Sequence, residues 1–266
     1  MKCNFHTHTA RCNHAVGLDE EYVLSAIEAG FDEIGFSDHT PWPFESGYVS
    51  PMRMRADELE EYVLSVNRLR EKYKDKIKIH LGLECEYFKD YIPWLCAVGE
   101  KYGIEYFLLG HHFSPDEEHG LYNGRIKTHA EIERYKNDVL EALESGLFFY
   151  VAHPDIFMRT YGEFDDYCEK ASREIIAKAI ETKTPLEYNL LGLTHCKEDG
   201  MKEGYPHSKF WHIAGEMGAL AVVGIDAHDP KAFLETEKFE KARAMLESSG
   251  VKLVFKNYKG TVLPNL

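Results

Sequence analysis

Short apolar segments alternate along the chain with longer segments in which apolar residues recur at helical spacing. The short segments are rich in branched and aromatic residues and have the length of buried β-strands. We expect strands at 1–8, 33–36, 77–83, 106–110, 148–152, 186–189 and 219–224. The longer segments predict amphipathic helices at 19–29, 57–73, 91–102, 128–144, 165–181, 208–217 and 239–248.

This alternation continues from end to end, and no Pro/Ser-rich linker or low-complexity tract interrupts it. Repeated strand–helix units build a parallel sheet covered by helices, so we expect one α/β domain over residues 1–266. The length of 266 residues suits a (β/α) barrel, which commonly takes about 250 residues. A loop that holds His195 is expected between the strand at 186–189 and the helix at 208–217, and residues 251–255 form a final apolar segment.

Polar side chains follow almost every predicted strand. The first strand ends in His6-Thr7-His8, and because alternate residues of an extended chain point to the same side, both imidazoles face one point. Later strands end at His39, Glu84, His111-His112, His153 and Asp226-Ala227-His228. Strands of a barrel end at one mouth, so these side chains are expected to converge there, with His14 one turn beyond His8.

Imidazole and carboxylate groups gathered at one point are ligands for Zn, Fe or Mn. A shared carboxylate such as Glu84 can hold two cations about 3.5–4 Å apart. The alternative is that each histidine is satisfied separately by local contacts. Their repeated position at strand ends favours a site for two to three divalent metal ions. The candidate ligands are His6, His8, His14, His39, Glu84, His112, His153, Asp226 and His228.

Charge and composition narrow the possible partners. The formal net charge of −14 opposes the nucleic-acid backbone, so no nucleic-acid partner is expected. A small phosphorylated substrate is compatible, because metal ions and one or two arginines reverse the local field in a cleft. No apolar run approaches the roughly 18 residues of a membrane span, and no signal-peptide pattern is present, so we expect a cytoplasmic protein. The scattered cysteines form no C-x-x-C pair. Cys12 and Cys85 are expected to be buried core residues rather than metal ligands.

Successive motifs of the chain resemble those of a known family. The motifs are His6-Thr7-His8, Ser37-Asp38-His39, Gly82-Leu83-Glu84, Leu108-Leu109-Gly110-His111-His112-Phe113, Ala152-His153-Pro154-Asp155 and Asp226-Ala227-His228. In their order and spacing they are similar, over nearly the whole chain, to the PHP (polymerase and histidinol phosphatase) superfamily. The chain length and the segment from His153 to Arg159 resemble most the stand-alone histidinol-phosphate phosphatases.

The resemblance implies a distorted (β/α)7 TIM-like barrel that hydrolyses L-histidinol phosphate to L-histidinol and phosphate in histidine biosynthesis. A hydroxide that bridges two cations would attack phosphorus. Asp226 or a neighbouring histidine is the candidate to accept its proton, and Arg159 is the candidate to clamp the phosphate. Departure of the alkoxide needs a proton or a metal, for which His228 or the third cation is the candidate. The implied ligand sets are His6, His8, Glu84 and Asp226 for one metal, Glu84, His112 and His153 for a second, and His14, His39 and His228 for a third.

One stretch departs from the resemblance. These phosphatases commonly carry a polar-Gly-Leu-Arg segment after strand six, where this chain has Asn189-Leu190-Leu191-Gly192-Leu193-Thr194-His195-Cys196. A second basic phosphate contact is therefore missing there or replaced by His195. Only one residue of the His111-His112 pair is expected to point inward, and His111 is the candidate to contact substrate. Candidate acids for the imidazole and ammonium ends of the substrate are Glu86, Asp38 and Asp116.

Several alternatives stay open at this point. One is a PHP phosphoesterase for another small phosphate ester or an oligonucleotide end, the latter disfavoured by the acidic charge. Another is a non-catalytic metal-binding domain, against which the full ligand set argues. An amidohydrolase-type hydrolase usually relies on a bridging lysine, and here Glu84 fills that role. The sequence carries no signal for an oligomeric state.

Overall fold

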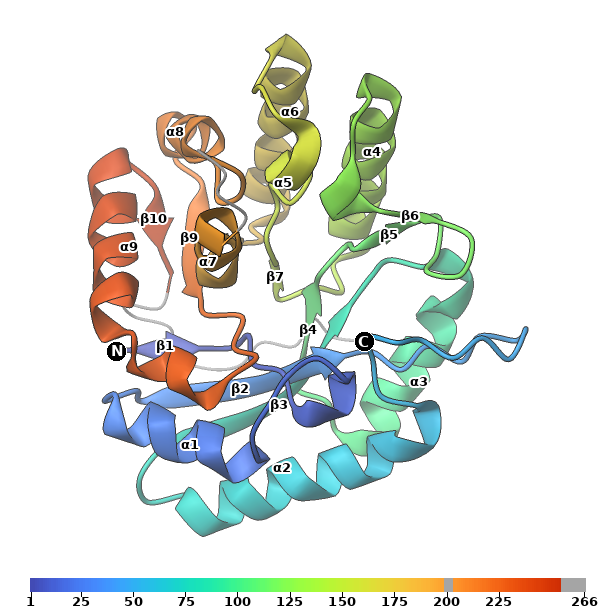
Figure 1. Ribbon diagram of the computed structural model, residues 1–266, viewed down its shortest axis with the longest axis vertical. Helices are drawn as coiled ribbons and strands as arrows, with labels where there is room; N and C mark the ends of the chain where they lie inside the picture. The colour runs from blue at the N-terminus through green and yellow to red at the C-terminus, as the bar shows by residue number, and fades with distance from the viewer. Residues whose placement is uncertain (199–202, 255–266) are drawn as a thin grey trace.

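A parallel sheet forms the centre of the molecule (Figure 1). The computed structural model describes residues 1–198 and 203–254. The sheet has eight strands in the order β1-β2-β3-β4-β7-β8-β9-β10. Their bounds are β1 (Cys3–Asn4), β2 (Glu33–His39), β3 (Lys78–Cys85), β4 (Tyr106–Leu109), β7 (Tyr150–Val151), β8 (Leu186–Asn189), β9 (Leu220–Gly224) and β10 (Lys252–Leu253). The order follows the sequence, so each strand lies beside its predecessor, as helical crossovers between parallel strands require.

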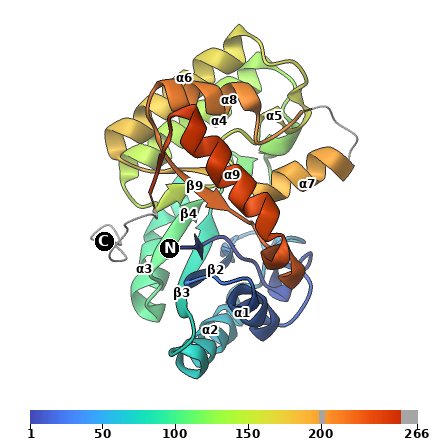
Figure 2. The same cartoon turned by 90° about the vertical axis from the view of Figure 1, so that its left-hand side faces the viewer.

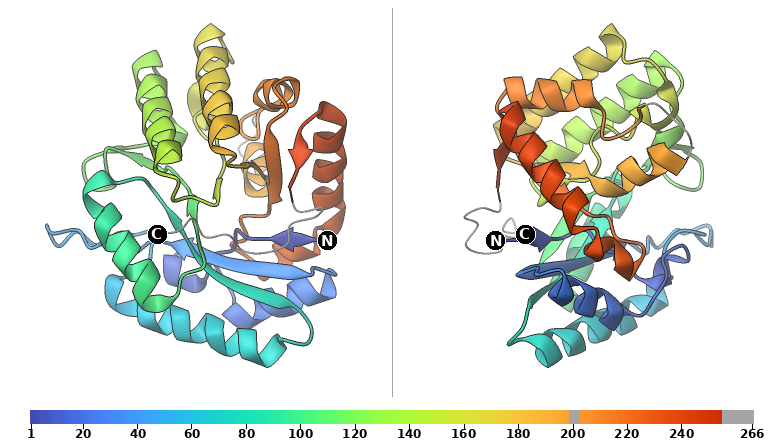
Figure 3. Two further views of the ribbon diagram at one scale, coloured as in Figure 1. Left: turned by 180° about the vertical axis from the view of Figure 1, so that it is seen from behind. Right: turned by 60° about the vertical axis from the view of Figure 1, so that its left-hand side comes forward.

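Helices follow the strands along the chain, and most of them cover the outer face of the sheet (Figures 1 and 2). Their bounds are α1 (Asp19–Glu28), α2 (Leu59–Tyr73), α3 (Ile92–Tyr102), α4 (His129–Ser145), α5 (Met158–Tyr161), α6 (Asp166–Thr182), α7 (Leu190–Glu198), α8 (Ser208–Glu216) and α9 (Thr236–Ser249). A capping box between Thr128 and Glu131 begins α4, and Gly146 in the left-handed conformation ends it. Seen from behind, α1 and α2 lie along β2 and β3, whereas α4 and α6 stand at the opposite end of the molecule (Figure 3).

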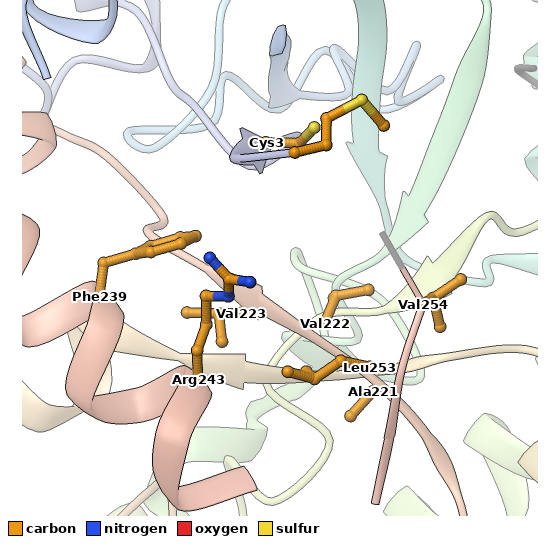
Figure 4. A pocket seen from close by; sticks show the side chains of 9 residues that line it. Cys3, Ala221, Val222, Val223, Phe239, Arg243, Leu253 and Val254 are labelled. Carbon is orange, nitrogen blue, oxygen red and sulfur yellow. The ribbon is translucent and has the colours of Figure 1, made fainter. Parts of the chain in front are cut away.

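The sheet closes into a barrel only at the carboxyl ends of its strands. Thr7 pairs with Ala227 in an isolated parallel bridge, and His8 N donates to Ala227 O at 2.9 Å. At the other end, a cavity of about 30 Å³ separates Cys3 of β1 from Val222 of β9 (Figure 4). The segments that follow β1 and β9 therefore meet where the polar strand ends lie.

Two apolar layers use alternate residues of the strands. In β4, Phe107 and Leu109 belong to the large cluster between sheet and helices, whereas Tyr106 and Leu108 face the barrel interior. The interior cluster consists of Cys3, Phe5, Tyr106, Leu108, Tyr150, Ala152 and Val222. It fills the amino-terminal part of the barrel, which leaves the carboxyl ends of the strands for polar side chains.

The predicted α/β alternation is confirmed, and the predicted strands and helices are present with ends displaced by a few residues. The apolar segment at 251–255 contributes the eighth strand, β10, as far as it is described; residue 255 lies outside the described residues. In the described ranges, no helix has both the length and the apolar character that a membrane span needs.

The loop expected to hold His195 is wrong at that residue, because His195 lies in α7. Asn189 Oδ1 accepts a hydrogen bond from Gly192 N at 2.9 Å, so the last residue of β8 also caps the first helical turn. Apolar residues occur only at the start of α7, too few to give a periodic signal. The short hairpin β5 (Phe113–Ser114) and β6 (Leu121–Tyr122), and α5, were likewise too short to predict.

Candidate metal centre

The predicted ligands lie together at the carboxyl ends of the strands, and we call them the ligand cluster. They are His6, His8 and His14 after β1, His39 in β2, Glu84 in β3, His112 after β4, His153 after β7, and Asp226 and His228 after β9. Most of them line a cavity of about 500 Å³. His6 and His8 are fully buried behind Glu84 and Asp226.

His6, His8 and Asp226 form one buried corner of the ligand cluster. The Nε2 atoms of His6 and His8 lie 3.1 Å apart. Asp226 Oδ1 lies 3.4 Å from His6 Nε2 and 3.1 Å from His8 Nε2. The two rings thus direct one nitrogen each to the same point, as the i, i+2 spacing on an extended chain predicts. Together the three side chains offer a group that can hold one cation.

Glu84 lies at the centre of the ligand cluster. Its Oε1 is 2.9 Å from His153 Nε2 and 3.4 Å from His112 Nε2. Its Oε2 is 2.9 Å from His39 Nδ1. Gly110 makes room for this carboxylate, since a Cβ there would lie 2.0 Å from Glu84 Oε1. A carboxylate with imidazoles on both oxygens has the arrangement of a bridging ligand.

His14 and His228 form the outer edge of the ligand cluster, with their Nε2 atoms 3.0 Å apart. His39 also groups with His228 and His8, and its ring stacks on that of His14 with centroids 5.4 Å apart. The sulfur of Cys12 groups with His14 and His228. Cys12 is fully buried but belongs to neither described apolar cluster. Its surroundings therefore differ from those expected of a cysteine that packs in the apolar core.

Two members of the ligand cluster adopt a left-handed backbone: φ is 55° at Asp226 and 32° at His153. For residues other than glycine this costs of order 1–3 kcal/mol, so the surroundings must hold the conformation. Glu187 Oε2 accepts a hydrogen bond from His153 N at 3.1 Å, and Asn189 Nδ2 donates to Asp226 Oδ2 at 3.0 Å. Side chains of β8 therefore hold both residues.

Glu187 itself was missed by the sequence analysis. Its Oε1 lies 2.8 Å from His6 Nδ1, and Asn189 Nδ2 donates to its Oε2 at 2.9 Å. A carboxylate on one imidazole nitrogen fixes the ring so that the other nitrogen faces a metal. The available signal was an acidic residue beside the buried Leu186 in a strand predicted to lie in the barrel.

The charges in the ligand cluster favour cations. Burial alone would raise the pKa of Glu84, but His112 and His6 hold it well below its ordinary value. The pKa of Asp226 is likewise held well below its ordinary value, chiefly by His6 against the effect of burial. In return, and also against burial, the close contact with Asp226 helps to raise the pKa of His8 to about 9. The carboxylates thus attract positive charge to the space between them and the imidazoles.

Two buried oxygens test whether divalent cations fit here. Glu84 Oε2 and Asp226 Oδ1 have no hydrogen-bond partner among the described residues. Leaving a buried acceptor unsatisfied costs roughly 1–3 kcal/mol. Each oxygen nevertheless lies close to an imidazole nitrogen, at 2.9 Å for His39 Nδ1 and 3.1 Å for His8 Nε2. Unsatisfied carboxylate oxygens beside imidazoles are the donor set that Zn, Fe or Mn accepts.

The acids expected to bind the cationic ends of the substrate lie outside the cavity lining. Asp38 and Glu86 are fully buried. Glu86 accepts a hydrogen bond from Arg53 Nη2 at 2.9 Å and contacts His112 Nδ1 at 3.1 Å, so it supports a member of the ligand cluster. Asp116 bonds within its own loop. None of these acids is among the described residues that line the cavity, which corrects the expectation.

Residues from connecting segments border the outer part of the cavity, and we call them the mouth. They are Pro51, Met52, Phe113, Tyr122, Arg125, Ile156, Arg159, Leu191, His195 and Tyr205. Arg159 Nη1 donates to Tyr122 OH at 3.1 Å. His195 is present here, on α7. His111 is not: it is buried, with Nε2 3.1 Å from Asp138 Oδ2, so the geometry does not support the substrate contact expected of it.

The sequence is similar to a known family model and to two histidinol-phosphatases. The PHP domain model matches residues 4–189. The histidinol-phosphatase of Bacillus subtilis (strain 168) is 27% identical over 268 residues, which cover 88% of this chain and 99% of that protein. The histidinol-phosphatase of Lactococcus lactis subsp. lactis (strain IL1403) is 26% identical over 259 residues, which cover 94% of this chain and 91% of that protein.

A solved structure shares the fold. The histidinol phosphate phosphatase from Lactococcus lactis subsp. lactis Il1403, complexed with zinc, L-histidinol and phosphate, matches with a TM-score of 0.71 and 20% sequence identity. The match covers 95% of each chain, and at this identity it establishes the fold alone. Since the family model covers well over half of the sequence, from the first strand to the end of β8, this chain belongs to the PHP domain family.

Proposed function

We propose that this protein is a metal-dependent phosphomonoesterase that hydrolyses L-histidinol phosphate to L-histidinol and phosphate. The proposal depends above all on Glu84, whose two oxygens contact imidazoles from different strands. Such a shared carboxylate can hold two cations over one phosphoryl group. Relatives named histidinol-phosphatase, matched over most of the chain, support the choice of substrate.

Two to three divalent ions would be held by the ligand cluster. The sets are His6, His8, Glu84 and Asp226; Glu84, His112 and His153; and His14, His39 and His228. Zinc, iron and manganese all accept this mixture of imidazole and carboxylate. When bound, such ions lower the pKa of water and take up charge on the phosphoryl oxygens.

Asp226 and His228 would have different roles. Asp226 Oδ2 is hydrogen-bonded to Asn189, whereas Oδ1 has no hydrogen bond among the described residues, so Oδ1 can accept a proton from the nucleophile. Burial and the neighbouring His8 lower the pKa of His228 to about 3. A neutral imidazole suits metal ligation better than proton donation, so we assign His228 to metal binding.

Arg159 would hold the phosphate. Its guanidinium carbon lies 5.9 Å from the centre of the Tyr122 ring, and Nη1 donates to the hydroxyl of the same residue. This contact orients the guanidinium at the cavity. A guanidinium can bind two phosphate oxygens together, which a lysine cannot do.

Hydrolysis of another small phosphate ester is the second candidate, and one observation favours it. Outside the ligand cluster, the described residues that line the cavity include no carboxylate. The ammonium group of L-histidinol phosphate would therefore find no acidic partner among them. A neutral leaving group would have no need of one.

Steady-state hydrolysis by the metal-replete protein separates these candidates. The substrates are L-histidinol phosphate, sugar phosphates, nucleoside monophosphates and a 5′-phosphorylated oligonucleotide, with the Asp226→Ala variant as the control for contaminating phosphatase. We expect the highest kcat/KM for L-histidinol phosphate. Preference for another ester would reassign the substrate, and no release from any ester would refute the assignment as a phosphatase.

A further inference from the structure

Arg125 is a second arginine in the mouth, and the proposed function leaves it without a role. Its side chain is exposed, lines the cavity, and makes no hydrogen bond or ion pair with any residue that the structure describes. The chain has 45 acidic and 31 basic residues, so carboxylates outnumber cations. Carboxylates contact Arg11, Arg53, Arg55, Arg70, Arg173 and Arg243. A guanidinium left unpaired in this surplus of acid is available for an anion from outside the chain.

The backbone beside Arg125 is fixed to the ligand cluster. Asn123 N donates to His112 O at 2.6 Å, and Asn123 Nδ2 donates to His111 O at 3.0 Å. Gly124 approaches the Tyr122 ring so closely that a Cβ would lie 2.5 Å from it. The turn that carries Arg125 therefore has a defined position relative to His112, although the arginine side chain itself is exposed.

The same turn is bonded to the helix that carries Arg159. Thr160 Oγ1 donates to Gly124 O at 3.2 Å and approaches Ile126 O at 3.5 Å. These two carbonyls flank Arg125 in the sequence, and Thr160 follows Arg159 directly. The two arginines that line the cavity are thus carried by segments that are hydrogen-bonded to each other.

We propose that Arg125 is a second cationic contact for the phosphoryl group of the substrate, beside Arg159. The inference rests on the proposed phosphomonoesterase function of this cavity. A net charge of −14 repels a phosphate dianion, and two guanidinium groups reverse the field where the anion must enter. Arg125 touches the substrate without taking part in proton transfer, so it binds ground state and transition state alike and acts on KM rather than on kcat.

Calorimetric titration of the zinc-loaded protein with inorganic phosphate tests Arg125 without turnover. We expect Arg125→Gln to weaken phosphate binding by roughly 10- to 100-fold, the loss of one hydrogen bond between charged groups. KM for L-histidinol phosphate should rise by a similar factor, with kcat within about twofold. Arg125→Lys keeps the charge without the planar fork, so its loss should be smaller. The control is Lys127→Gln, which removes an exposed positive charge from the same segment outside the cavity lining.

The outcomes separate this inference from the proposed function. Equal phosphate affinity in Arg125→Gln and Lys127→Gln would overturn the role of Arg125, even if L-histidinol phosphate is hydrolysed. No phosphate binding by the unaltered protein at millimolar concentration would overturn it as well. Weaker phosphate binding in Arg125→Gln alone would sustain it, even if another ester proves to be the substrate. Thermal melting of each variant checks that the fold is intact.

Discussion

The ligand cluster and the mouth border the same cavity but are built in different ways. The ligand cluster comes from strand ends, and its central residues are buried, with Glu84 and His153 at 1% and 2% exposure. The mouth comes from the β5–β6 hairpin, α5, α7 and the segment before α2, and Arg125 is exposed there. The sheet therefore determines where the chemistry takes place, whereas the connecting segments determine what reaches it.

Glu84→Gln should have the largest effect, because it removes the charge shared by both sides of the ligand cluster. We expect metal content to fall and kcat/KM to decrease by at least about 10³-fold, the upper range for one electrostatic group. Elemental analysis and phosphate release measure the two effects. Glu118→Gln, outside the cavity lining, is the control. Full metal content and activity in Glu84→Gln would disprove the bridging role.

Arg53→Met tests how the mouth is attached to the ligand cluster. Arg53 is buried and pairs with Glu86 at 2.9 Å and Glu117 at 2.6 Å. Removing it leaves two buried carboxylates without the arginine that neutralises them, so the free energy of unfolding should fall by about 3–5 kcal/mol. Urea unfolding measures the change, and Arg55→Met, which breaks an exposed pair with Asp57, should show almost none. Equal stability of the two variants would contradict this account.

Glu187→Gln should weaken metal binding indirectly, because Glu187 contacts His6 of the ligand cluster. The carboxylate fixes His6 through Nδ1, and loss of such support typically weakens metal affinity or activity about 10- to 100-fold. Competition with a chromophoric chelator measures the affinity. Asp138→Asn is the matched control, since Asp138 contacts His111, which lies outside the ligand cluster. If both variants weaken metal binding equally, Glu187 has no special role.

His80 should give the smallest effect, remote from both regions. Burial would lower its pKa, but contacts with Glu105 at 2.8 Å and Glu33 at 2.7 Å raise it above the ordinary 6.5. A raised folded-state pKa stabilises fully below pH 6.5, and this contribution is lost as pH rises through the folded-state value. The free energy of unfolding, measured in urea, should therefore decline above pH 6.5 more steeply than in His80→Gln. Parallel pH profiles would show that His80 contributes nothing.

The ligand cluster was largely predictable from the sequence. Parallel strands end at one edge, so a residue such as His39 or Glu84 at the end of an apolar run can be placed there without knowing the packing. The role of Glu187 was not predicted, because this residue lies inside its strand, one residue before Tyr188, rather than beyond the strand end. Its contact with His6 joins residues 181 positions apart, which no local pattern reports.

The mouth could not be predicted in the same way. Its residues come from short segments without periodicity, and their positions depend on single tertiary hydrogen bonds such as Thr160 to Gly124. His195 was predicted on a loop, whereas it lines the cavity from α7. The position of Arg125 at the cavity could not be predicted from the sequence. An arginine in a polar turn is usually a surface residue, and only the fold shows that this one lies beside a cavity.

Metal titration of the chelator-treated protein, read as phosphate release from L-histidinol phosphate, tests the central claim most directly. The ligand cluster predicts no activity without metal, and recovery that reaches a plateau at two to three equivalents of zinc. Activity that survives complete chelation, or a plateau at one equivalent, would contradict a shared carboxylate between cations at the strand ends.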